Sequence, residues 1–419
     1  MSEAKILGYI NEKKDIGGIV FLEVIPNTDL KIITVVAKKN FSRDAWKTAK
    51  KAKLGAAIKV TGIIPEKAVS RKGVELLARE IEIVSNPVDV LPVDPSGKTE
   101  ILFDTRLEYR YFLLRTLKER AIFKIRAKAL KFAREFFEER RFLEVHTPKI
   151  CGAGAEGGAT LFTLDYFGRK AFLAQSPQLY KQMLMAGIPR VYEITPYFRA
   201  EKFHTTRHLN ECWGIDCELA FIESQEDVMR VLEDLVHYII SKVSKECAKE
   251  LEILNVKVNV PSKPFKRLTY KEALEILKNK GIEVKWGEDF SDREEAALGE
   301  EMLKEGHELY FIVEYPWEVK PFYIMRKGEL SEAFDLDYKG LEIASGGQRE
   351  HRYEELVKNI KDKGLSPEDF EFYLNAFKYG MPPHGGFGLG LERLLIKMLG
   401  FNNVREVVLF PRDIHRLIP

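Results

Sequence analysis

Five short apolar runs, each long enough for a β-strand, alternate with turn residues over the first 85 positions. They lie at residues 6–10, 19–25, 31–37, 57–64 and 74–84. A helical stretch over 42–53 separates the third run from the fourth, and Ser42 is a candidate N-cap. Five strands with one helix in that place are the layout of an OB barrel, which binds oligonucleotides on one sheet face. Small barrels also bind proteins, so the pattern leaves the kind of partner open.

The segment 86–98 (NPVDVLPVDPSGK) interrupts this pattern with three prolines and a glycine. Proline lacks a backbone donor and has a fixed φ, so the segment is neither helix interior nor central strand. We therefore predict a barrel domain over 1–85, a linker or hinge over 86–105 and a second domain over 106–419.

Helices and strands mix without regular alternation in the second domain. Helical periodicity marks 122–141 and 228–254. Strand-like runs lie at 171–174, 191–198, 309–314, 322–325 and 341–345. This irregular order predicts an α+β domain around an antiparallel sheet.

Composition and charge narrow the class of protein. The chain is 45% hydrophobic and 31% charged, which is typical of a globular protein. No apolar run reaches the ~18 residues of a membrane span, and residues 1–14 are too charged for a signal peptide, so we expect a cytoplasmic protein without a membrane partner. Residues 1–98 hold 17 Lys and Arg against 12 Asp and Glu, which fits a polyanion partner or simply solvated lysines. The four cysteines form no CxxC pair and predict neither disulfides nor a zinc site.

A glycine-rich turn at 385–393 (GGFGLGLER) leads into an apolar helix at 391–399. Glycines let a backbone approach a ligand closely, and Arg393 in the first helical turn suits a phosphate or an adenine ring. Tight packing alone explains such a turn equally well. The segment is not a P-loop, because no Gly-Lys-Ser/Thr follows.

Two arginines flank a loop after the strand at 191–198. Arg199 belongs to FRAE at 198–201, and Arg207 belongs to TTRHL at 205–209. Guanidinium groups bind carboxylate and phosphate oxygens through paired donors, so the two arginines suit an anionic substrate. An ordinary surface hairpin with salt bridges is the alternative.

The run 342–349 (EIASGGQR) offers a carboxylate and a hydroxyl. In a regular strand Glu342 would share a face with Ala344, so a bulge is needed to bring Ser345 beside Glu342. The two oxygens together fit a hard cation such as Mg²⁺ that is held mainly through substrate phosphates. A polar edge strand without a metal is the alternative.

In their order along the chain, these segments resemble a known family. Pro148 after the helix, FRAE with Arg199, and GLGLER ending at Arg393 are similar to the three signature motifs of class II aminoacyl-tRNA synthetases. QSPQLYK at 175–181 and SGGQR at 345–349 resemble aspartyl-tRNA synthetases of the archaeal and eukaryotic type. The resemblance covers essentially the whole chain, and its motifs are most specific in the second domain.

The resemblance implies an OB-fold anticodon-binding domain followed by a class II catalytic domain, an antiparallel sheet flanked by helices. It implies a homodimer formed through 136–150, with Pro148 at the interface. The implied activity is an ATP- and Mg²⁺-dependent ligase that converts L-aspartate to aspartyl-adenylate and transfers it to the 3′ end of tRNA(Asp). Charging of tRNA(Asn) in addition stays open. No covalent protein nucleophile is required, because positioning and charge neutralisation of two anions supply the rate.

The resemblance also implies roles for single residues around the nucleotide. Arg199 contacts the substrate carboxylate and the α-phosphate, and Arg393 stacks on the adenine ring; these two are the catalytic candidates. Arg207 holds the far phosphates, and Glu201 reads the adenine. The metal candidates are Glu342 and Ser345, and the remaining candidates of the ATP site are Ala200, His208, Leu209, Gly390, Leu391 and Glu392.

The resemblance also implies which amino acid is the substrate, through two cationic side chains. Lys181 and Arg349 are implied to meet the side-chain carboxylate of aspartate, while Gln178 and Glu156 hold the α-ammonium group. Asparaginyl-tRNA synthetases, which resemble this chain closely, carry an apolar residue where Lys181 stands. A buried lysine facing a neutral amide would lack a counter-charge at a cost of roughly a few kcal/mol, so aspartate is favoured over asparagine. Further candidates around the amino acid are Arg199, Asp216 and Ser345.

In the barrel, the resemblance implies that Phe21 stacks on an anticodon base, a contact worth ~1–3 kcal/mol. The alternative is that Phe21 belongs to the core. Asn11 and Arg71 occupy positions that differ between family members strict for tRNA(Asp) and members that also charge tRNA(Asn). Arg71 keeps the basic character of the strict form, whereas Asn11 does not match the usual tryptophan. Ile25 and Ile32 also replace an arginine and a glutamine of the family, so strictness toward tRNA stays open.

Three other functions stay open beside the first. Lys181 argues against an asparagine–tRNA ligase, and the N-terminal barrel argues against a paralogue that amidates aspartate through the adenylate. A non-charging RNA-binding paralogue would be expected to lose Arg199, Arg393 or Glu342, and all three are present.

Overall fold

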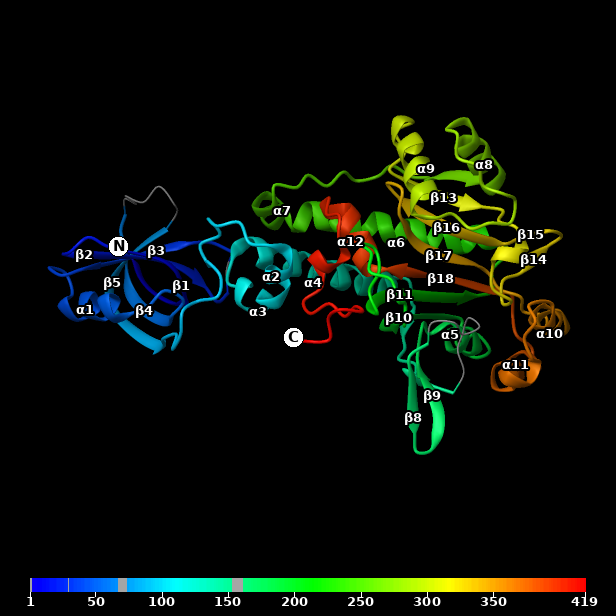
Figure 1. The fold of residues 1–419 in the computed structure, drawn as a ribbon, viewed down its shortest axis with the longest axis horizontal. Coiled ribbons are helices and arrows are strands. Elements are labelled where there is room, and N and C mark those ends of the chain that lie inside the picture. Colours follow the sequence, from blue (N-terminus) through cyan, green and yellow to red (C-terminus); the bar gives the residue numbers. More distant parts are fainter. Residues whose placement is uncertain (1, 29, 67–73, 153–160) are drawn as a thin grey trace. The chain divides into compact units, whose positions relative to one another are not determined.

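The computed structural model describes residues 2–28, 30–66, 74–152 and 161–419. They form two compact units, one of Met1–Ala127 with Cys247–Val256 and Pro419, the other of Lys128–Glu246 with Lys257–Ile418. Figure 1 labels the elements of both units. The domain boundaries at 85/86 and 105/106 stay predictions.

A closed barrel of five strands begins the first unit, as the sequence predicts. Its strands are β1 (Ser2–Asp15), β2 (Ile19–Pro26), β3 (Ile33–Lys38), β4 (Ala57–Ile64) and β5 (Val74–Ser85). They pair in the order β1-β2-β3-β5-β4, and β4 closes the barrel on β1. Alternation along β2 sets the core: Val20, Leu22 and Val24 are buried in it, whereas Phe21 lies on the outer face and is only partly buried.

Helix α1 (Arg43–Lys51) follows β3 and precedes β4, again as predicted. Ser42 is its N-cap and accepts a hydrogen bond from the Ala45 amide at 3.3 Å. Lys13 of β1 donates to the carbonyls of Lys50 and Ala52 at the other end. Both ends of the helix therefore have side-chain partners, which fixes it against the barrel.

Helices follow the barrel after a stretch without helix or strand. They are α2 (Phe103–Glu108), α3 (Arg110–Leu113) and α4 (Leu117–Glu139), and α4 is the helix expected at 122–141. The single helix expected over 228–254 is wrong, because the structure has two, α6 (Gln225–Glu246) and α7 (Ala248–Leu254). Cys247 separates them with φ −115° and ψ 24°, outside the helical region.

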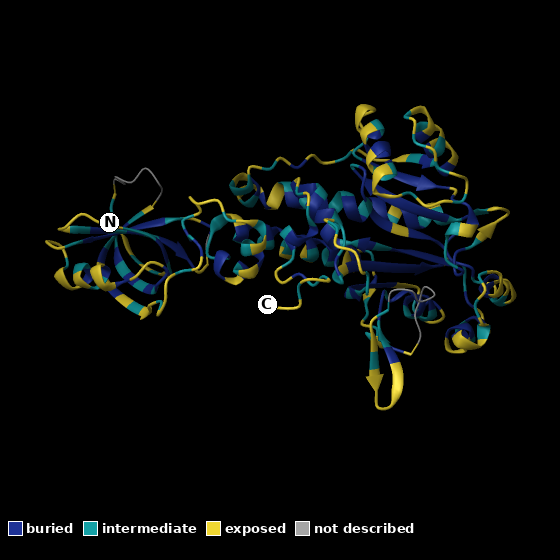
Figure 2. Cartoon of the chain, in the orientation of Figure 1, coloured by how far each residue is buried: buried dark blue, intermediate teal, exposed yellow. Residues whose placement is uncertain are grey.

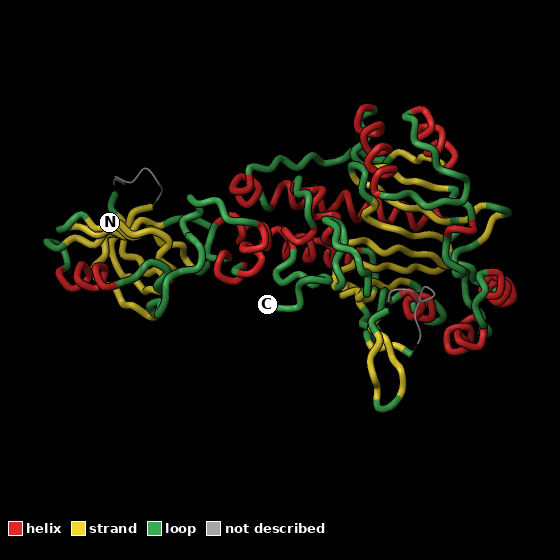
Figure 3. The backbone as a smooth tube through the Cα atoms, in the orientation of Figure 1, coloured by secondary structure: helices red, strands yellow, loops and turns green. Residues whose placement is uncertain are grey.

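An eight-stranded sheet forms the centre of the second unit (Figure 3). Its strand order is β12-β13-β16-β17-β18-β11-β10-β6. The bounds are β6 (Leu143–Glu144), β10 (Arg190–Phe198), β11 (Glu211–Ala220), β12 (Lys266–Thr269), β13 (Leu309–Val313), β16 (Ala333–Tyr338), β17 (Glu342–Gln348) and β18 (His384–Gly390). The six inner strands are antiparallel as predicted, and the outermost strand on each side runs parallel to its neighbour.

Helix α6 covers one face of this sheet. Its buried residues, among them Val228 and Leu232, pack against β17 and β18, and a Cβ on Gly385 would lie 2.8 Å from Val228. Successive residues of a strand point to opposite faces, so Gly386 and Gly388 lie on the other face. Figure 2 shows the inner strands as largely buried. The candidate site lies on the face opposite α6.

Smaller elements complete the second unit. They are the three-stranded sheet of β7 (Ile150–Cys151), β8 (Thr163–Tyr166) and β9 (Arg169–Leu173), the pair β14 (Arg326–Lys327) and β15 (Leu330–Ser331), and helices α5 (Gln178–Leu184), α8 (Tyr270–Asn279), α9 (Asp292–Lys304), α10 (Tyr353–Asp362), α11 (Glu371–Phe377) and α12 (Leu391–Leu399). Helix α12 has the bounds expected from the sequence. The strand expected at 322–325 is wrong: the segment is a turn in which Ile324 makes one isolated bridge to Arg349. Among the described residues, no helix is long and apolar enough to cross a bilayer.

Candidate active site

A cavity of about 1090 Å³, including the space of its open mouth, lies on the face of the sheet opposite α6. Its charged lining consists of Arg199, Arg207, Arg349, Arg393, Lys320, Glu201, Asp216, Glu342 and Glu392. Four arginines therefore meet in one cavity: Arg199 and Arg349 directly follow the strands β10 and β17, Arg207 lies in a loop and Arg393 in helix α12. Such a set suits a ligand, or a pair of ligands, with several negative charges.

Glycines of β18 form the floor of the cavity. Gly388 pairs with Asp216 of β11 on one side and with Ser345 of β17 on the other. A Cβ on Gly386 would collide with the Cys217 carbonyl and the Glu218 carboxylate. Gly386 therefore has to be a glycine, and Gly388 and Gly390, which line the cavity, expose bare backbone that a ligand can approach between the flanking side chains.

Strand β17 contains the bulge that the sequence analysis required. Glu342 pairs with Asp337, and Ser345 pairs with Asp335, with a shift of register between them. Since Asp335 and Asp337 are two positions apart in β16, Glu342 and Ser345 lie on the same face of the sheet. Asp335 lies on this face too, and sequence reasoning missed it. Burial and then the charge of Asp335 raise the pKa of Glu342, which is the environment that a bound cation would relieve.

Lys320 is a second residue that sequence reasoning missed. It follows a short 3-10 turn (Trp317–Val319), lines the cavity and donates a hydrogen bond to Asp335 at 2.6 Å. Burial is the largest influence and opposes its charged form, but the carboxylates of Asp335, Asp289 and Glu342 together outweigh it and raise the pKa of Lys320. The ammonium group therefore stays charged beside the metal candidates. No motif marks this lysine in the sequence.

Buried polar atoms in and beside the cavity include some that have no hydrogen-bond partner among the described residues. Examples are Glu201 Oε2, Gln178 Nε2 and Asp335 Oδ1. Folded proteins leave few such atoms unpaired, so each is a candidate contact for a ligand group. Burial raises the pKa of Glu201, as expected for a carboxylate that awaits a donor.

Arg393 anchors one end of the cavity, which we call the nucleotide end. Its guanidinium donates to the Glu342 carbonyl at 2.8 Å and lies 3.4 Å from His208 Nε2. Burial, and then the charge of Arg393, lower the pKa of His208 to about 4, so its imidazole is neutral near pH 7. Thr205 Oγ1 lies 2.7 Å from the other ring nitrogen. The loop expected to hold ATP phosphates is thus joined to the helix that carries Arg393.

Arg207 lines the nucleotide end but already has acidic partners. Its guanidinium lies 2.9 Å from Glu295 and 3.0 Å from Asp292, both in the first turns of α9. Burial and then the nearby Glu342 raise the pKa of Glu295 to about 7. Both carboxylates contact Nη1, so a phosphate that approaches Arg207 at this nitrogen competes with them.

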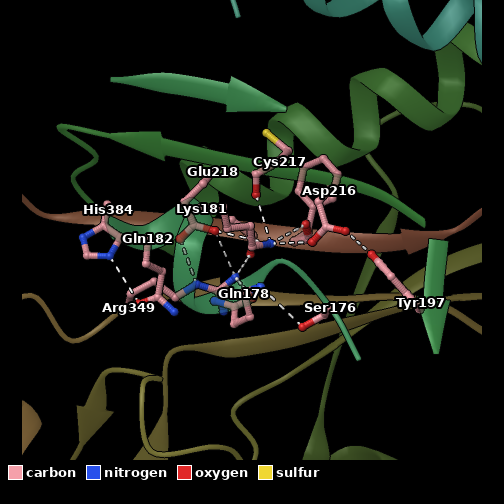
Figure 4. A network of polar contacts seen from close by, with 12 residues as sticks. Ser176, Gln178, Lys181, Gln182, Tyr197, Asp216, Cys217, Glu218, Arg349 and His384 are labelled. Carbon is pink, nitrogen blue, oxygen red and sulfur yellow. Dashed lines mark hydrogen bonds and ion pairs between the residues drawn. The ribbon is translucent and has the colours of Figure 1, made fainter. Parts of the chain in front are cut away.

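Four charged side chains form a network at the other end, which we call the amino-acid end (Figure 4). Lys181 Nζ lies 2.9 Å from Asp216 and 3.4 Å from Glu218, and Arg349 Nε lies 3.0 Å from Glu218. All four are at most 3% exposed. Burial would raise the pKa of Glu218, but Arg349 and Lys181 outweigh it and lower that pKa below its usual value. Two cations and two carboxylates therefore balance inside the protein.

This network corrects the argument from sequence for Lys181. Its Nζ also donates to the Phe387 carbonyl at 2.9 Å, so the lysine has counter-charges and acceptors without any substrate. Unlike Arg349 and Gln178, Lys181 is not among the residues that line the cavity. The positive charge of Lys181 affects the cavity indirectly: it balances the negative charges of Asp216 and Glu218, which would otherwise make this end of the cavity more negative. The expected direct contact with a substrate carboxylate stays a prediction.

The remaining candidates are distributed unevenly. Arg199, Leu209, Gly390 and Ser345 line the cavity, whereas Ala200 and Leu391 do not; Leu391 is buried in the core. Glu392 lines the cavity and accepts a hydrogen bond from the Trp213 amide at 3.0 Å, which ties α12 to β11. Glu156 and Arg71 lie outside the described residues.

In the barrel, Asn11 and Phe21 differ in exposure. Asn11 is 6% exposed, and its amide donates to the carbonyls of Pro95 at 2.8 Å and Arg115 at 3.0 Å. Phe21 lies on the outer face of the barrel, opposite Val36 of β3, which argues against the core alternative. A role in reading an anticodon stays a prediction for both.

Residues 103–414 match the family described as tRNA synthetases class II (D, K and N). The match spans most of the chain, and the protein belongs to this family. The resemblance seen in the three sequence motifs is thereby confirmed. Its fold, a five-stranded barrel followed by a catalytic domain with an antiparallel sheet, agrees with that membership.

Curated relatives narrow the family. The chain is 51% identical over 422 residues to an aspartate–tRNA(Asp) ligase of Pyrococcus abyssi, covering 100% of this chain and 96% of the relative. It is 50% identical over 419 residues to an aspartate–tRNA(Asp/Asn) ligase of Methanopyrus kandleri, with the same coverage. Solved structures also resemble this chain. The asparaginyl-tRNA synthetase of Pyrococcus horikoshii, complexed with asparaginyl-adenylate, gives a TM-score of 0.91 at 33% identity. The similarity covers 100% of this chain and 96% of that one. An aspartyl-tRNA synthetase from Entamoeba histolytica gives a TM-score of 0.87 at 31% identity, covering 100% and 90%.

Proposed function

We propose that this protein is an aspartate–tRNA ligase. It activates L-aspartate with ATP to give aspartyl-adenylate and pyrophosphate, and transfers the aspartyl group to the 3′ end of tRNA(Asp). The observation that carries this proposal is a single cavity with a charge-balanced amino-acid end at Arg349 and a nucleotide end at Arg207 and Arg393. Relatives about half identical over the full chain are named for the same activity.

The charge balance at the amino-acid end favours aspartate. Without Lys181, Asp216 and Glu218 would face only Arg349, and the excess negative charge would repel a side-chain carboxylate. With Lys181 present, the network is neutral, and Arg349 on the cavity wall is available to attract the carboxylate of aspartate. Asparagine would gain nothing from these cations. The same residues thus explain the choice that the sequence analysis assigned to a direct contact of Lys181.

At the nucleotide end, the protein positions groups and neutralises charge. Arg199 lines the cavity, and its charge acts on Tyr197 at the amino-acid end and on His208 at the nucleotide end, so it is suited to hold the substrate carboxylate against the α-phosphate. Arg207 binds the far phosphates once they displace Glu295 and Asp292, and the unpaired Glu201 Oε2 accepts a hydrogen bond from the adenine amino group. Arg393, held by the Glu342 carbonyl, stacks on the ring. The carboxylate of aspartate itself is the nucleophile, so no side chain needs to form a covalent intermediate.

Mg²⁺ fits the oxygens on this face. Glu342, Ser345 and Asp335 offer hard ligands, and Asp335 Oδ1 has no partner among the described residues. No group of three or more His, Cys, Asp or Glu side chains in the described part of the chain forms a complete metal cage. This suits an ion bound mainly through phosphate oxygens, as Mg²⁺ usually is. When bound, the ion supplies positive charge that lowers the repulsion between the two anionic substrates.

The remaining assignments belong to the same proposal. The protein is cytoplasmic and acts as a homodimer through residues 136–150, with Pro148 at the interface. The barrel over 1–85 binds the anticodon, with Phe21 stacked on a base and Asn11 and Arg71 nearby, while 86–105 is the hinge and 106–419 the catalytic domain. Glu156 and Gln178 hold the α-ammonium group of the substrate. The outward position of Phe21 supports the stacking role.

ATP–pyrophosphate exchange tests the activity directly. We expect exchange that depends on aspartate and is at least about tenfold weaker with asparagine, since a buried polar mismatch costs about 1–3 kcal/mol. Exchange with asparagine alone, or with neither amino acid, would refute the proposal. Omitting Mg²⁺ in the presence of a chelator tests the metal.

Charging of tRNA(Asn) is a second candidate activity. The observation that favours it is the 50% identity to a relative named as an aspartate–tRNA(Asp/Asn) ligase. Purified tRNA(Asp) and tRNA(Asn) charged side by side with aspartate decide it. Charging of tRNA(Asp) alone would make the protein a strict enzyme.

A further inference from the structure

Tyr197 of β10 lies across the floor of the amino-acid end. Its ring passes over Gly214 of the neighbouring strand, and its hydroxyl donates a hydrogen bond to Asp216 Oδ2. Tyr197 is 8% exposed and lines the cavity together with Asp216. In Figure 4, Tyr197 and Lys181 approach Asp216 from opposite sides. Each carboxylate oxygen of Asp216 therefore has its own donor, Tyr197 for Oδ2 and Lys181 for Oδ1.

Glycines on two neighbouring strands make room for this tyrosine. A Cβ on Gly214 would fall inside the ring and hydroxyl of Tyr197, so no other residue is compatible with the ring in this place. A Cβ on Gly388 would lie 3.3 Å from the hydroxyl and 3.5 Å from Asp216 Oδ1. The tyrosine and the two glycines thus form one steric unit, and this unit sets the position of the Asp216 carboxylate.

Two donors on opposite oxygens fix the plane of a carboxylate, whereas one donor leaves it free to turn. Each oxygen can accept more than one hydrogen bond, so Asp216 keeps capacity for a third donor. Burial and the charge of Asp216 raise the pKa of Tyr197 well above its usual value, so the hydroxyl keeps its proton and remains a donor. The cavity beside Asp216 is where the cationic end of an amino acid would find an acceptor.

We propose that Tyr197 is a positioning residue for the amino acid: its hydroxyl holds Asp216 so that this carboxylate accepts a hydrogen bond from the substrate α-ammonium group, and Gly214 is the residue that permits it. The inference rests on the proposed function, because amino-acid activation brings an ammonium group to this end. It assigns Tyr197 to substrate orientation and not to the chemistry at phosphorus. Its loss therefore weakens amino-acid binding and leaves nucleotide binding intact.

The first test removes one hydroxyl. Tyr197→Phe is expected to raise the KM for aspartate about tenfold in ATP–pyrophosphate exchange, the usual loss for a hydrogen bond to a charged group. The kcat and the KM for ATP stay within about twofold, since Tyr197 does not hold the nucleotide. Tyr192→Phe is the matched control: Tyr192 is a buried residue of the same strand on the opposite face, and its hydroxyl donates to Glu144 at 2.9 Å. An unchanged KM for aspartate overturns the proposal. So does a parallel loss in both KM values and in kcat, which would indicate a structural role.

The second test uses the steric unit and does not depend on the folding of the first variant. Gly214→Ala alone is expected to raise the KM for aspartate and to lower the melting temperature by at least about 2–4 °C. In a Tyr197→Ala background, the same Gly214→Ala change is expected to have no further effect, because the ring that it meets is gone. Equal effects of Gly214→Ala in both backgrounds, or no effect in either, overturn the proposal.

The two proposals fail in different ways. Absence of aspartate-dependent exchange in the unmodified protein removes the proposed function. If that protein exchanges with asparagine instead, the same variants are compared with asparagine, because the α-ammonium group is common to both amino acids. Normal aspartate exchange with no KM difference between the unmodified protein and Tyr197→Phe removes only the inference on Tyr197.

Discussion

The two ends of the cavity hold their charges in different ways. At the amino-acid end, Lys181 of α5 and Arg349, which follows β17, both pair with Glu218 of β11, and all three are at most 3% exposed. At the nucleotide end, Arg207 and Arg393 are 17% and 24% exposed. Arg207 takes its partners from α9, outside the sheet. The charges of the first end are therefore paired with one another inside the protein, whereas a phosphate proposed to bind Arg207 at Nη1 would replace partners from α9.

This difference has a physical reason. A small amino acid offers few contacts, so its selection depends on rigid, pre-positioned charges whose orientation costs nothing at the moment of binding. ATP offers several phosphate oxygens and can displace weaker, partly exposed ion pairs, which contribute little to stability. Substitutions at the amino-acid end should therefore affect both folding and activity, and those at the nucleotide end mainly activity.

The largest effect is expected for Lys181→Leu. Removing one partner of a buried charge network leaves carboxylates unpaired at a cost of about 3–5 kcal/mol, and aspartate-dependent exchange should fall at least about 100-fold. Exchange assays and thermal melting measure both consequences. Lys271→Leu, an exposed lysine of α8, is the control and should behave as the unmodified protein. Unchanged exchange in Lys181→Leu would show that the network does not select the substrate.

The next largest effect is expected at low pH, where protonation of His384 near the amino-acid end lowers the free energy of unfolding. His384 is fully buried, and burial lowers its pKa from 6.5 to about 4, so the folded protein keeps it neutral while the unfolded chain takes up a proton below pH 6.5. Its contribution to stability is complete above pH 6.5 and is lost as the pH falls through 4, a change of about 3 kcal/mol. Urea unfolding of the unmodified protein and of His384→Asn at pH 7.5 and 4.5 measures it. Equal pH dependence of the two would contradict the prediction.

At the nucleotide end, Arg393→Ala should act on ATP alone. Loss of a charged donor and a stacking surface is worth about 1.5–3 kcal/mol, so the KM for ATP should rise about 10–100-fold. The KM for aspartate and the melting temperature should change little, because Arg393 is partly exposed and its main partner is a backbone carbonyl. A comparable rise in both KM values would mean that the two ends are not independent.

The smallest effect is expected for Glu295→Gln, and it tests directly whether the partners of Arg207 compete with ATP. Glu295→Gln weakens the pair that holds Arg207, and the freed guanidinium should bind phosphate better. We expect the KM for ATP to fall about two- to fivefold, the size of a partly exposed ion pair. Glu300→Gln, on the same helix and paired with Lys280, is the control. An increased KM for ATP would indicate that Glu295 serves the nucleotide and does not compete with it.

Local patterns were sufficient for the barrel and for the motif-bearing strands. The periodicity of β1–β5 and the cap at Ser42 are short-range features, and the structure agrees with both. The failures lie where tertiary context decides. An apolar stripe continues through Cys247, so periodicity alone could not reveal the break between α6 and α7. The apolar run at 322–325 is buried as a turn, because burial and strand pairing are separate properties.

Only those residues of the candidate site that belong to sequence motifs could be predicted from the sequence. The bulge in β17 followed from the need to place Glu342 and Ser345 on one face. Asp335 and Lys320 carry no local signal, because their roles depend on a sheet register and a turn that join distant segments. The internal partners of Lys181 were missed for the same reason: Lys181 lies on α5 and its partners Asp216 and Glu218 on β11, so only the folded chain places them around its ammonium group.

Asn11 has a consequence for how tRNA preference is read from variants. Its amide joins β1 to the carbonyls of Pro95 and Arg115, and Arg115 in turn donates to the Gly55 carbonyl at 3.0 Å. Because Asn11 is buried, replacing it would first remove the hydrogen bonds to Pro95 and Arg115 in the segment that follows the barrel. It would change little of the surface that could contact RNA. If such a variant charged tRNA differently, the change would reflect the altered position of this segment. The effect of residue 11 on tRNA preference would therefore have to be tested with a side chain that still donates to both carbonyls.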